Sequence, residues 1–370
     1  MKIGSVTLAS PFALAPMAGM TDTAFRRLVK QRGGCGLVVT EMVSSEGLVR
    51  GIGRTLEYAE YTEEERPVSI QIFGGDPHKM AAAAQIVEEM GADIVDVNMG
   101  CPVPKIAKHR AGCSLMRTPE HAASVIGAMA KAVSIPVTVK MRSGWDETRI
   151  NAPELAMMVE DVGAAAVAVH GRTAAQADTG QSDWTLIDKV AERVSIPVFG
   201  SGDCVVPSDL VGKIQETAVA GVLVGRGALR NPWIFEQAQR LWSGDVTRDV
   251  PLAERGQFLL AYIDLLLSEA VGQEAEGFRH TAGFEQTVGP KRRSPASRER
   301  WIINKLRALG SWYTRGCENG SKLRIAINRA ASLEELRGLI CEFFAGSARI
   351  KPFDGESAAH EALQAVANRR

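Results

Sequence analysis

One cysteine of this 370-residue chain lies in a sequence context that favours chemistry over packing. Cys101 belongs to the stretch Asn98-Met99-Gly100-Cys101-Pro102, which follows an apolar run and precedes basic side chains within residues 105–110. A thiol with the ordinary pKa of about 8.5 is mostly protonated at neutral pH, so Cys101 can act as a general acid or, once activated, as a nucleophile. The alternative is a small buried hydrophobic side chain, the usual role of a free cysteine. We assign that structural role to Cys35, Cys204 and Cys341.

The spacing of the six cysteines excludes other kinds of site. They form no CxxC pair and no cysteine–histidine cluster with metal-ligand spacing, so we expect no zinc site, no thioredoxin-type pair and no bound metal. The amino terminus lacks the apolar core of a signal peptide, and no run approaches the ~18 consecutive apolar residues of a membrane span. These features predict a cytoplasmic protein with reduced thiols and no membrane partner.

Two glycine-rich segments are typical of phosphate binding. Gly200-Ser201-Gly202-Asp203 and Gly225-Arg226-Gly227-Ala228 each follow an apolar run and precede helical sequence. Backbone N–H groups in such loops and at helix N-termini bind phosphate, and Arg226 adds a positive charge. A tight turn is the alternative for either segment alone. Neither segment contains GxGxxG, so we do not expect a Rossmann-type nicotinamide site.

Polar side chains that follow other apolar runs can bind a flat polar ring. They are Gln71, Asn98, Lys140 and His170. Together with a phosphate site, they suit a ring with a phosphorylated tail, and flavin mononucleotide (FMN) fits that description. A cation such as Lys140 stabilises the reduced flavin anion at the N1/O2 edge, and a fixed amide such as Gln71 can bond the pyrimidine edge. The alternatives for Lys140 are a Schiff-base lysine and an ion pair.

The order of strand-like and helix-like segments predicts how these residues meet. Short β-branched runs bounded by Gly or Pro alternate with Ala-rich segments of helical period. Eight βα units in about 230 residues are the size of a TIM (β/α)8 barrel, whose catalytic groups lie at the carboxyl ends of its strands. A doubly wound sheet is the structural alternative. The predicted strands are residues 12–16, 37–40, 68–73, 94–98, 137–141, 166–170, 198–201 and 222–224, with crossover helices at 78–90, 120–133 and 153–162.

After residue 241 the pattern becomes helical. A helical run at 251–270 and two or three helices at 300–345 predict a small all-α domain, separated by a stretch rich in Gly, Pro and charge. We therefore expect an α/β TIM barrel followed by this helical domain. The expected boundaries are a catalytic barrel at 1–241, a helical domain at 242–350 with an exposed loop at 272–297, and a flexible tail at 351–370.

The net charge hides an asymmetry along the chain. The 43 basic and 43 acidic side chains cancel, which by itself argues against a nucleic-acid partner. Residues 1–278, however, hold 26 basic and 34 acidic side chains, and residues 279–370 hold 17 and 9. An acidic barrel joined to a basic helical domain is what an enzyme acting on RNA can use, because phosphate attraction then lies in one module.

Several of these motifs resemble the tRNA-dihydrouridine synthases, in particular their bacterial type B branch. Asn98 to Pro102 is the most specific, and moderately specific motifs begin at Ala15 (APMAGMTD), Gln71 (QIFG), Val139 (VKMRSGW) and Val169 (VHGRT). The resemblance covers residues 8–235 and resumes at 301–330. The family's enzymes are flavin barrels with a helical tRNA-binding domain, and they use NADPH to reduce the C5–C6 double bond of uridines in tRNA.

The resemblance implies a role for each motif. NADPH reduces FMN, hydride passes to C6 of a uridine flipped out of the tRNA, and Cys101 protonates C5. Asn98 and Arg142 should face the uridine. The expected partners are tRNA and NADPH, and we expect the protein to be a monomer. By the same resemblance, FMN is bound by Pro16, Met17, Gln71, Lys140, His170, Gly202, Asp203, Gly225 and Arg226.

Three other functions remain as alternatives. A flavin barrel that reduces or oxidises a free small molecule, such as a dihydropyrimidine or dihydroorotate dehydrogenase, would not need the basic helical domain. An RNA-binding protein without catalysis would not need Cys101, Lys140 and His170. A phosphosugar lyase with Lys140 as its Schiff base would leave Cys101 and Asn98 without a role.

Overall fold

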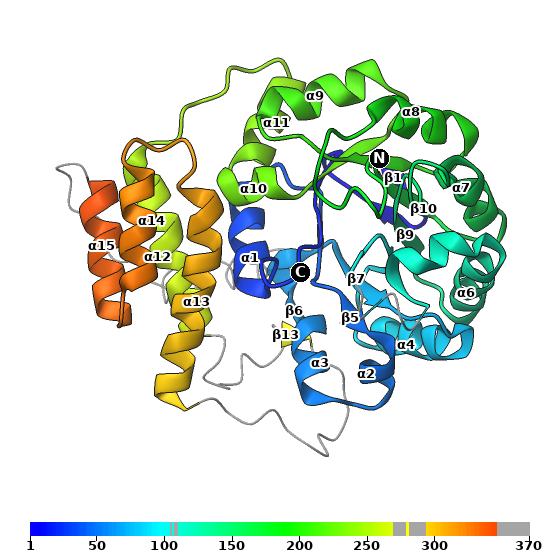
Figure 1. Ribbon diagram of the computed structural model, residues 1–370, viewed down its shortest axis with the longest axis horizontal. Helices are drawn as coiled ribbons and strands as arrows, with labels where there is room; N and C mark the ends of the chain where they lie inside the picture. Colours follow the sequence, from blue (N-terminus) through cyan, green and yellow to red (C-terminus); the bar gives the residue numbers. More distant parts are fainter. Residues whose placement is uncertain (104–105, 107–109, 269–278, 281–293, 346–370) are drawn as a thin grey trace, which may run out of the picture. The chain divides into compact units, whose positions relative to one another are not determined.

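The computed structural model describes residues 1–103, 106, 110–268, 279–280 and 294–345 (Figure 1). The chain divides into two compact units. Of the described residues, the barrel unit holds Met1–Thr247 and Arg279–His280, and the helical unit holds 248–268 and 294–345. The barrel unit thus extends past residue 241 to Thr247. The expected tail at 351–370 lies outside the described residues.

Eight parallel strands form a closed barrel in the first unit, which confirms the predicted TIM-barrel fold. Each barrel strand pairs with the next along the chain, and the last pairs with the first through Val222 and Phe12. This closure excludes the doubly wound sheet, which has two open edges. The strands are β3 (Phe12–Leu14), β4 (Leu37–Val39), β7 (Val68–Phe73), β8 (Ile94–Met99), β9 (Val137–Arg142), β10 (Ala166–His170), β11 (Val198–Ser201) and β12 (Gly221–Val224).

Helices on the outside of the barrel begin where the sequence marks a helix start (Figure 1). Asp76 caps α4 (Pro77–Glu89) by accepting the N–H groups of His78 and Lys79. Prolines occupy the first turns of α4, α6 (Pro119–Ala132) and α7 (Ala152–Asp161), where a missing N–H costs no hydrogen bond. The three expected crossover helices are confirmed to within one residue at each end. The other helices of this unit that follow barrel strands are α1 (Thr23–Arg32), α8 (Trp184–Arg193), α9 (Pro207–Glu216), α10 (Arg226–Arg230) and α11 (Ile234–Trp242).

Short elements between β4 and β7 were not expected from the sequence, because each is too short to show a hydrophobic period. Tertiary contacts hold this segment. The guanidinium of Arg26 on α1 donates to the Glu65 carboxylate at 2.5 Å, and both side chains are almost fully buried. The segment contains β5 (Val43–Ser44), α2 (Ser45–Val49), α3 (Gly53–Ala59), β6 (Tyr61–Thr62) and a 3-10 turn (Glu63–Glu65). A hairpin of β1 (Lys2–Ile3) and β2 (Val6–Thr7) precedes the barrel.

Part of the loop expected at 272–297 has regular structure instead. Arg279–His280 form β13, which pairs antiparallel with β6. Helix α13 begins at Pro295, because Ser294 caps its first turn through the N–H of Ser297. A strand of two residues has no period that a sequence could reveal. The rest of the expected loop lies outside the described residues.

The helical unit is built around aromatic side chains. The ring of Tyr313 stacks on Phe258 at 5.7 Å and meets the edge of Phe344 at 6.4 Å. The Tyr313 hydroxyl donates to the carbonyl of Arg255 at 2.8 Å, so the buried polar atom is satisfied. In the described part of the chain, none of the helices is long and apolar enough to span a membrane. The unit consists of α12 (Leu252–Ser268), α13 (Pro295–Tyr313), α14 (Gly320–Arg329) and α15 (Leu333–Ala345).

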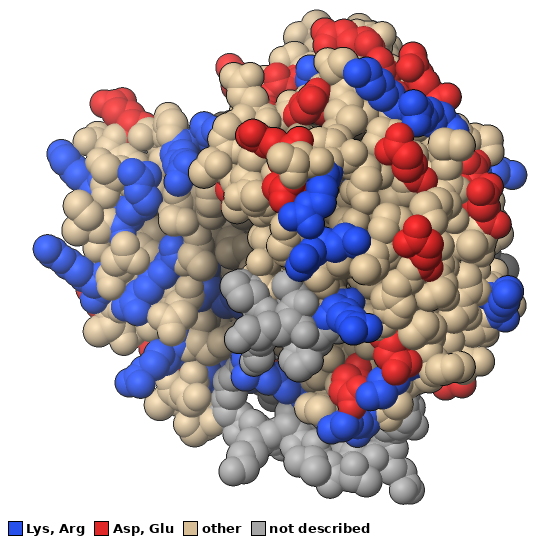
Figure 2. Space-filling model, turned by 45° about the vertical axis from the view of Figure 1, so that its right-hand side comes forward, with Lys and Arg blue, Asp and Glu red and all other residues tan. Residues whose placement is uncertain are grey.

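The structural division halves the expected charge asymmetry. Taken over the unit boundaries, the barrel unit carries 26 basic and 30 acidic side chains, a net −4, and the helical unit carries 17 and 13, a net +4. The division after residue 278 gave too large a charge difference, because it counted Asp249, Glu254 and Asp264 with the barrel although they belong to the helical unit. In the view of Figure 2, the charged side chains of the helical unit are mainly basic, whereas basic and acidic side chains alternate over the barrel.

Candidate active site

The polar residues singled out from the sequence lie at the carboxyl ends of the barrel strands, which open on one rim. Asn98 of β8 lies beside Lys140 of β9, and Arg142 of β9 lies beside His170 of β10. Gln71 of β7 pairs with Asp96 of β8, two residues before Asn98 along that strand. The remaining expected residues follow strand ends: Pro16 and Met17 after β3, Cys101 after β8, Gly202 and Asp203 after β11, and Gly225 and Arg226 after β12.

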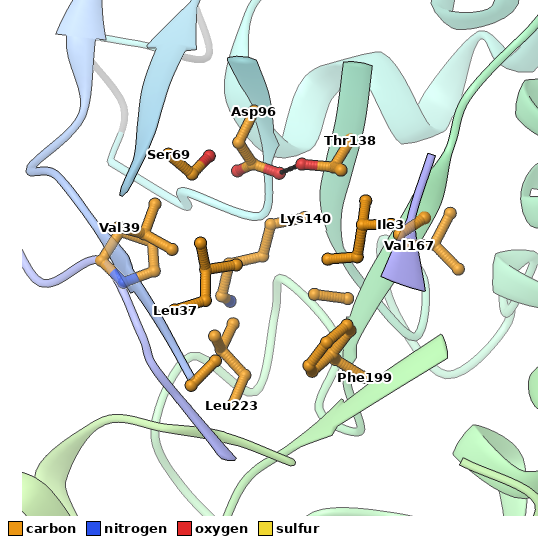
Figure 3. Close-up of a pocket in the computed structure, with 14 residues that line it drawn as sticks. Ile3, Leu37, Val39, Ser69, Asp96, Thr138, Lys140, Val167, Phe199 and Leu223 are labelled. Carbon is orange, nitrogen blue, oxygen red and sulfur yellow. Dashed lines mark hydrogen bonds between the residues drawn. The ribbon is translucent and has the colours of Figure 1, made fainter. Parts of the chain in front are cut away.

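A cavity inside the barrel reaches this rim at Lys140 and Pro16 (Figure 3). Most of its wall is apolar, and Ile3 of the amino-terminal hairpin is part of it. Asp96 and Thr138 bring polar atoms into this wall and bond each other, with the threonine hydroxyl donating at 2.6 Å. The hydroxyl of Ser69, also in the wall, has no hydrogen-bond partner among the residues that the structure describes.

Lys140 brings a cation into a poorly solvated space. Burial and, to a smaller extent, the charge of Arg142 lower its pKa to about 8, although Asp96 acts in the opposite direction. In the part of the chain that the structure describes, the ammonium makes no hydrogen bond or ion pair. A buried cation without a partner is costly, so an anionic ligand at this position would be stabilised strongly.

The imidazole of His170 is neutral at physiological pH. Burial, together with the surrounding charges of Lys140, Arg142, Arg172 and Arg226, lowers its pKa to about 2. Its Nε2 lies 3.4 Å from a guanidinium nitrogen of Arg172. A neutral imidazole can donate or accept a hydrogen bond without repelling the cations around it.

Arg172 organises the loops after β10 and β11 and was not singled out from the sequence. One guanidinium nitrogen of Arg172 donates to both carboxylate oxygens of Asp203, at 2.8 and 2.9 Å. Another donates to the carbonyl of Thr179. The Ser182 N–H bonds the same carboxylate at 2.7 Å, and Arg226 lies 3.7 Å from it. The carboxylate of Asp203 is therefore occupied, and it would repel a phosphate. Its backbone N–H and the guanidinium of Arg226 can attract one.

Two glycines near this loop differ in what they permit. A Cβ at Gly200 would lie 2.2 Å from the ring of Trp184, whose indole N–H donates to the carbonyl of Gly202. Only glycine therefore fits at position 200. A Cβ at Gly225 would meet nothing nearer than the sulfur of Met17 at 3.5 Å. A small side chain would therefore fit at Gly225, in van der Waals contact with Met17.

The turn after β3 is held by its own side chains. The N–H of Met17 donates to the Thr21 hydroxyl at 3.0 Å, and that hydroxyl donates to the Met17 carbonyl at 3.2 Å. The N–H of Gly19 donates to the buried carboxylate of Glu41 at 2.5 Å. The backbone at Pro16 and Met17 is consequently a fixed edge of the rim. Thr21 and Glu41 carry no sequence signal that distinguishes this role from ordinary capping.

The backbone around Cys101 is fixed from two strands. The side-chain oxygen of Asn98 accepts the N–H groups of Gly100 at 3.2 Å and of Cys101 at 2.9 Å. Arg142 donates to the carbonyl of Gly100 at 2.8 Å and uses a second nitrogen on the carbonyls of Thr173 and Ala177. The Cys101 side chain remains partly exposed. Asn98 and Arg142, which we expected to face a uridine, thus also hold the segment that carries the thiol.

The other cysteines differ from Cys101. Cys35 and Cys204 are buried, and burial raises the pKa of Cys35 to about 11 and that of Cys204 to about 12. Their assignment as packed, unreactive thiols agrees with this environment. The same assignment is wrong for Cys341 of α15, which is only partly buried. Within the described ranges no group of acidic, histidine or cysteine side chains could hold a metal ion.

Comparison with known proteins is consistent with this rim. Residues 13–288 match the family described as dihydrouridine synthase. A tRNA-dihydrouridine synthase B of Xanthomonas axonopodis pv. citri is 40% identical over 345 residues, 93% of this chain and 96% of that protein. The tRNA-dihydrouridine synthase B of Pseudomonas aeruginosa is 40% identical over 264 residues, 71% of this chain and 79% of that protein.

The barrel also resembles solved structures of distant sequence. A histamine dehydrogenase from Rhizobium sp. 4-9 superposes with a TM-score of 0.50 at 12% identity. The superposition covers 72% of this chain and 50% of that chain. At this identity the likeness concerns the fold alone.

Proposed function

The chain belongs to the dihydrouridine synthase family, since the family match spans residues 13–288, and we propose that it is a flavin-dependent tRNA-dihydrouridine synthase. One observation carries the assignment beyond the family: a partly exposed thiol, Cys101, and a cation, Lys140, that has no hydrogen-bond or ion-pair partner among the described residues lie on one barrel rim. A proton donor and a site for an anionic redox cofactor are the two parts that reduction of a uracil ring requires.

The residues at the rim fit FMN. Lys140 supplies the positive charge that stabilises a reduced flavin ring, and the neutral His170 adds a hydrogen bond without repelling that charge. The guanidinium of Arg226 and the backbone at Gly202, Asp203 and Gly225 suit the phosphate. Gln71 and the fixed edge at Pro16 and Met17 would complete the ring site.

The chemistry requires one hydride and one proton. When bound and reduced by NADPH, the flavin supplies the hydride for C6 of the uracil. The Cys101 thiol donates its proton to C5, so that both carbons of the former double bond gain one hydrogen. Asn98 and Arg142 keep the backbone at Gly100 and Cys101 in place during this transfer. Because the thiol is partly exposed, water can return the proton to it after each turnover.

A single opening serves both substrates in turn. NADPH binds first and its oxidised product leaves, after which a uridine flipped out of the tRNA enters the same space. This order explains why the sequence contains no Rossmann-type motif. The enzyme would act in the cytoplasm, where its tRNA substrates are, and as a monomer.

The helical unit supplies the attraction for tRNA. It carries a net +4, and basic side chains such as Arg315, Lys322 and Arg329 lie exposed on its surface. Arg315 stacks on the Trp312 ring at 4.2 Å, an arrangement in which a base or a phosphate can be contacted. The attraction is sequence-independent and weakens with salt.

Two measurements test the proposed function. The purified protein should be yellow and should release FMN when it is denatured; a colourless preparation that takes up no added FMN would contradict the redox assignment. Mass spectrometry of tRNA from cells lacking the protein should show that dihydrouridine is lost at particular positions. Restoring the gene should restore those positions, and unchanged tRNA would contradict the substrate assignment.

A further inference from the structure

A chain of side-chain hydrogen bonds connects the barrel interior with the backbone of Cys101. The carboxylate of Asp96 accepts from the Gln71 amide at 2.7 Å. The Gln71 oxygen accepts from the Asn98 amide at 2.8 Å, and the Asn98 oxygen accepts the Cys101 N–H at 2.9 Å. Asp96, Gln71 and Asn98 are all nearly buried. Water therefore competes little with these three hydrogen bonds, which we call the relay, and each bond depends on the previous one.

The direction of every bond in this relay follows from its first member. A carboxylate only accepts, and Asp96 has a donor on each oxygen, Thr138 on one and Gln71 on the other. Gln71 must therefore turn its NH2 group toward Asp96 and its oxygen toward Asn98. Asn98 must then turn its NH2 group toward Gln71, which leaves its oxygen to accept the backbone N–H groups of Gly100 and Cys101.

We propose that Asp96 is a positioning residue for this reaction: its carboxylate sets the polarity of the Gln71–Asn98 relay that holds the backbone of Cys101. The inference rests on the proposed function only in giving Cys101 the role of proton donor. Asp96 does not touch the thiol and acts on it through two amides. Without that polarity, the Asn98 amide could present its NH2 group to two backbone N–H groups, and the segment would lose its acceptor.

The surroundings of Asp96 explain why a carboxylate persists inside an apolar wall. Burial raises its pKa, whereas the bonds from Thr138 and Gln71 and the charge of Lys140 oppose that increase. The same carboxylate raises the pKa of Lys140. A neutral residue of similar shape would be easier to bury but could not fix both amides.

The substitution Asp96→Asn tests the direction of the relay with almost no change in shape. The new amide no longer accepts at both positions: while its oxygen accepts the Thr138 hydroxyl, its NH2 group faces Gln71 and opposes the direction of both following amides, and the original direction returns only if the hydroxyl turns to accept. We expect alkylation of Cys101 by iodoacetamide, followed by peptide mass spectrometry of the full chain, to become about three- to tenfold faster as its backbone is released. Ser69→Ala is the matched control, because the Ser69 hydroxyl lies in the same cavity wall and bonds none of the described residues.

A second substitution separates polarity from packing. In Asp96→Asn combined with Gln71→Glu, the carboxylate moves to position 71 and accepts from both sides, so Asn98 regains its original direction. We expect the alkylation rate to return to within about twofold of the unmodified protein. A purely structural role for Asp96 does not predict this recovery, because the double variant is no better packed than the single one.

The outcomes are distinct. An unchanged rate in Asp96→Asn, an equal increase in Ser69→Ala, or no recovery in the double variant would each overturn the proposal. If Asp96→Asn does not fold, Gln71→Met interrupts the relay at its next member and must also accelerate alkylation; an unchanged rate would overturn the proposal there. Alkylation needs no tRNA, so a protein that forms no dihydrouridine would refute the proposed function and leave this result intact.

Discussion

The barrel rim and the helical unit use charged side chains in opposite ways. At the rim, Arg142 and Arg172 are almost fully buried, and their guanidinium groups donate hydrogen bonds to loop carbonyls. In the helical unit the buried side chains are mainly apolar or aromatic, and Arg315 and Lys322 lie in solvent. Buried, fully bonded charges fix geometry, whereas exposed charges attract a partner without fixing it. If the proposed function is correct, the chemistry belongs to the barrel and the nonspecific part of tRNA binding to the helices.

Loss of the rim thiol should have the largest effect. We expect Cys101→Ala to lower dihydrouridine formation on tRNA by about 10²- to 10⁴-fold, the usual contribution of a general acid. Reduction of bound flavin by NADPH, followed by stopped-flow absorbance, should be unaffected because it does not use the thiol. Cys341→Ala, which changes a partly buried cysteine of the helical unit, is the control. Unchanged turnover in Cys101→Ala would mean that another group is the acid.

Removing a buried charge from the rim should destabilise the barrel. Arg172→Met leaves the Asp203 carboxylate and two loop carbonyls without their donor, and we expect unfolding free energy to fall by about 2–4 kcal/mol. Arg193→Met removes an ion pair with Glu154 whose side chains are 53% and 60% exposed, so it should cost less than about 1 kcal/mol. Urea unfolding measures both. Equal losses would show that burial does not distinguish the two arginines.

The neutral His170 should make the barrel sensitive to acid. Its pKa is about 2 in the fold and near the ordinary value of about 6.5 when unfolded, so below pH 6.5 the unfolded chain binds the extra proton. Stability should therefore decrease as pH falls through 6.5, by up to about 2 kcal/mol at pH 5. His170→Gln should lack this part of the pH dependence in urea unfolding of flavin-free protein. Parallel curves for the two proteins would contradict a buried neutral imidazole.

A single exposed charge on the helical unit should have the smallest effect. Arg315→Ala removes the guanidinium that stacks on Trp312, and we expect tRNA affinity to fall severalfold and its salt slope by about one. Dihydrouridine formation at saturating tRNA should be nearly unchanged. Arg193→Ala on the barrel surface is the charge-matched control and should leave binding as it was. If both arginines matter equally, tRNA attraction does not belong to the helical unit in particular.

Much of the fold was predictable because its signals are local. The eight barrel strands were expected from runs such as residues 68–73 and 166–170, and the structure places β7 and β10 there. The crossover helices were expected from start signals such as Asp76-Pro77. The elements between β4 and β7 and the strand at Arg279–His280 were not, because they are too short to show a period and depend on pairing with distant residues.

The sequence by itself determined which chemical groups stand at the strand ends, since the barrel's parallel order brings all those ends to one rim. The sequence alone therefore predicts five residues of the rim: Gln71, Asn98, Cys101, Lys140 and His170. The tertiary structure decided what each group is bonded to. The direction of the Gln71 and Asn98 amides, the role of Asp96, and the capture of Asp203 by Arg172 depend on side chains from different strands. Those contacts are set by sheet register and barrel closure, which no local pattern of residues records.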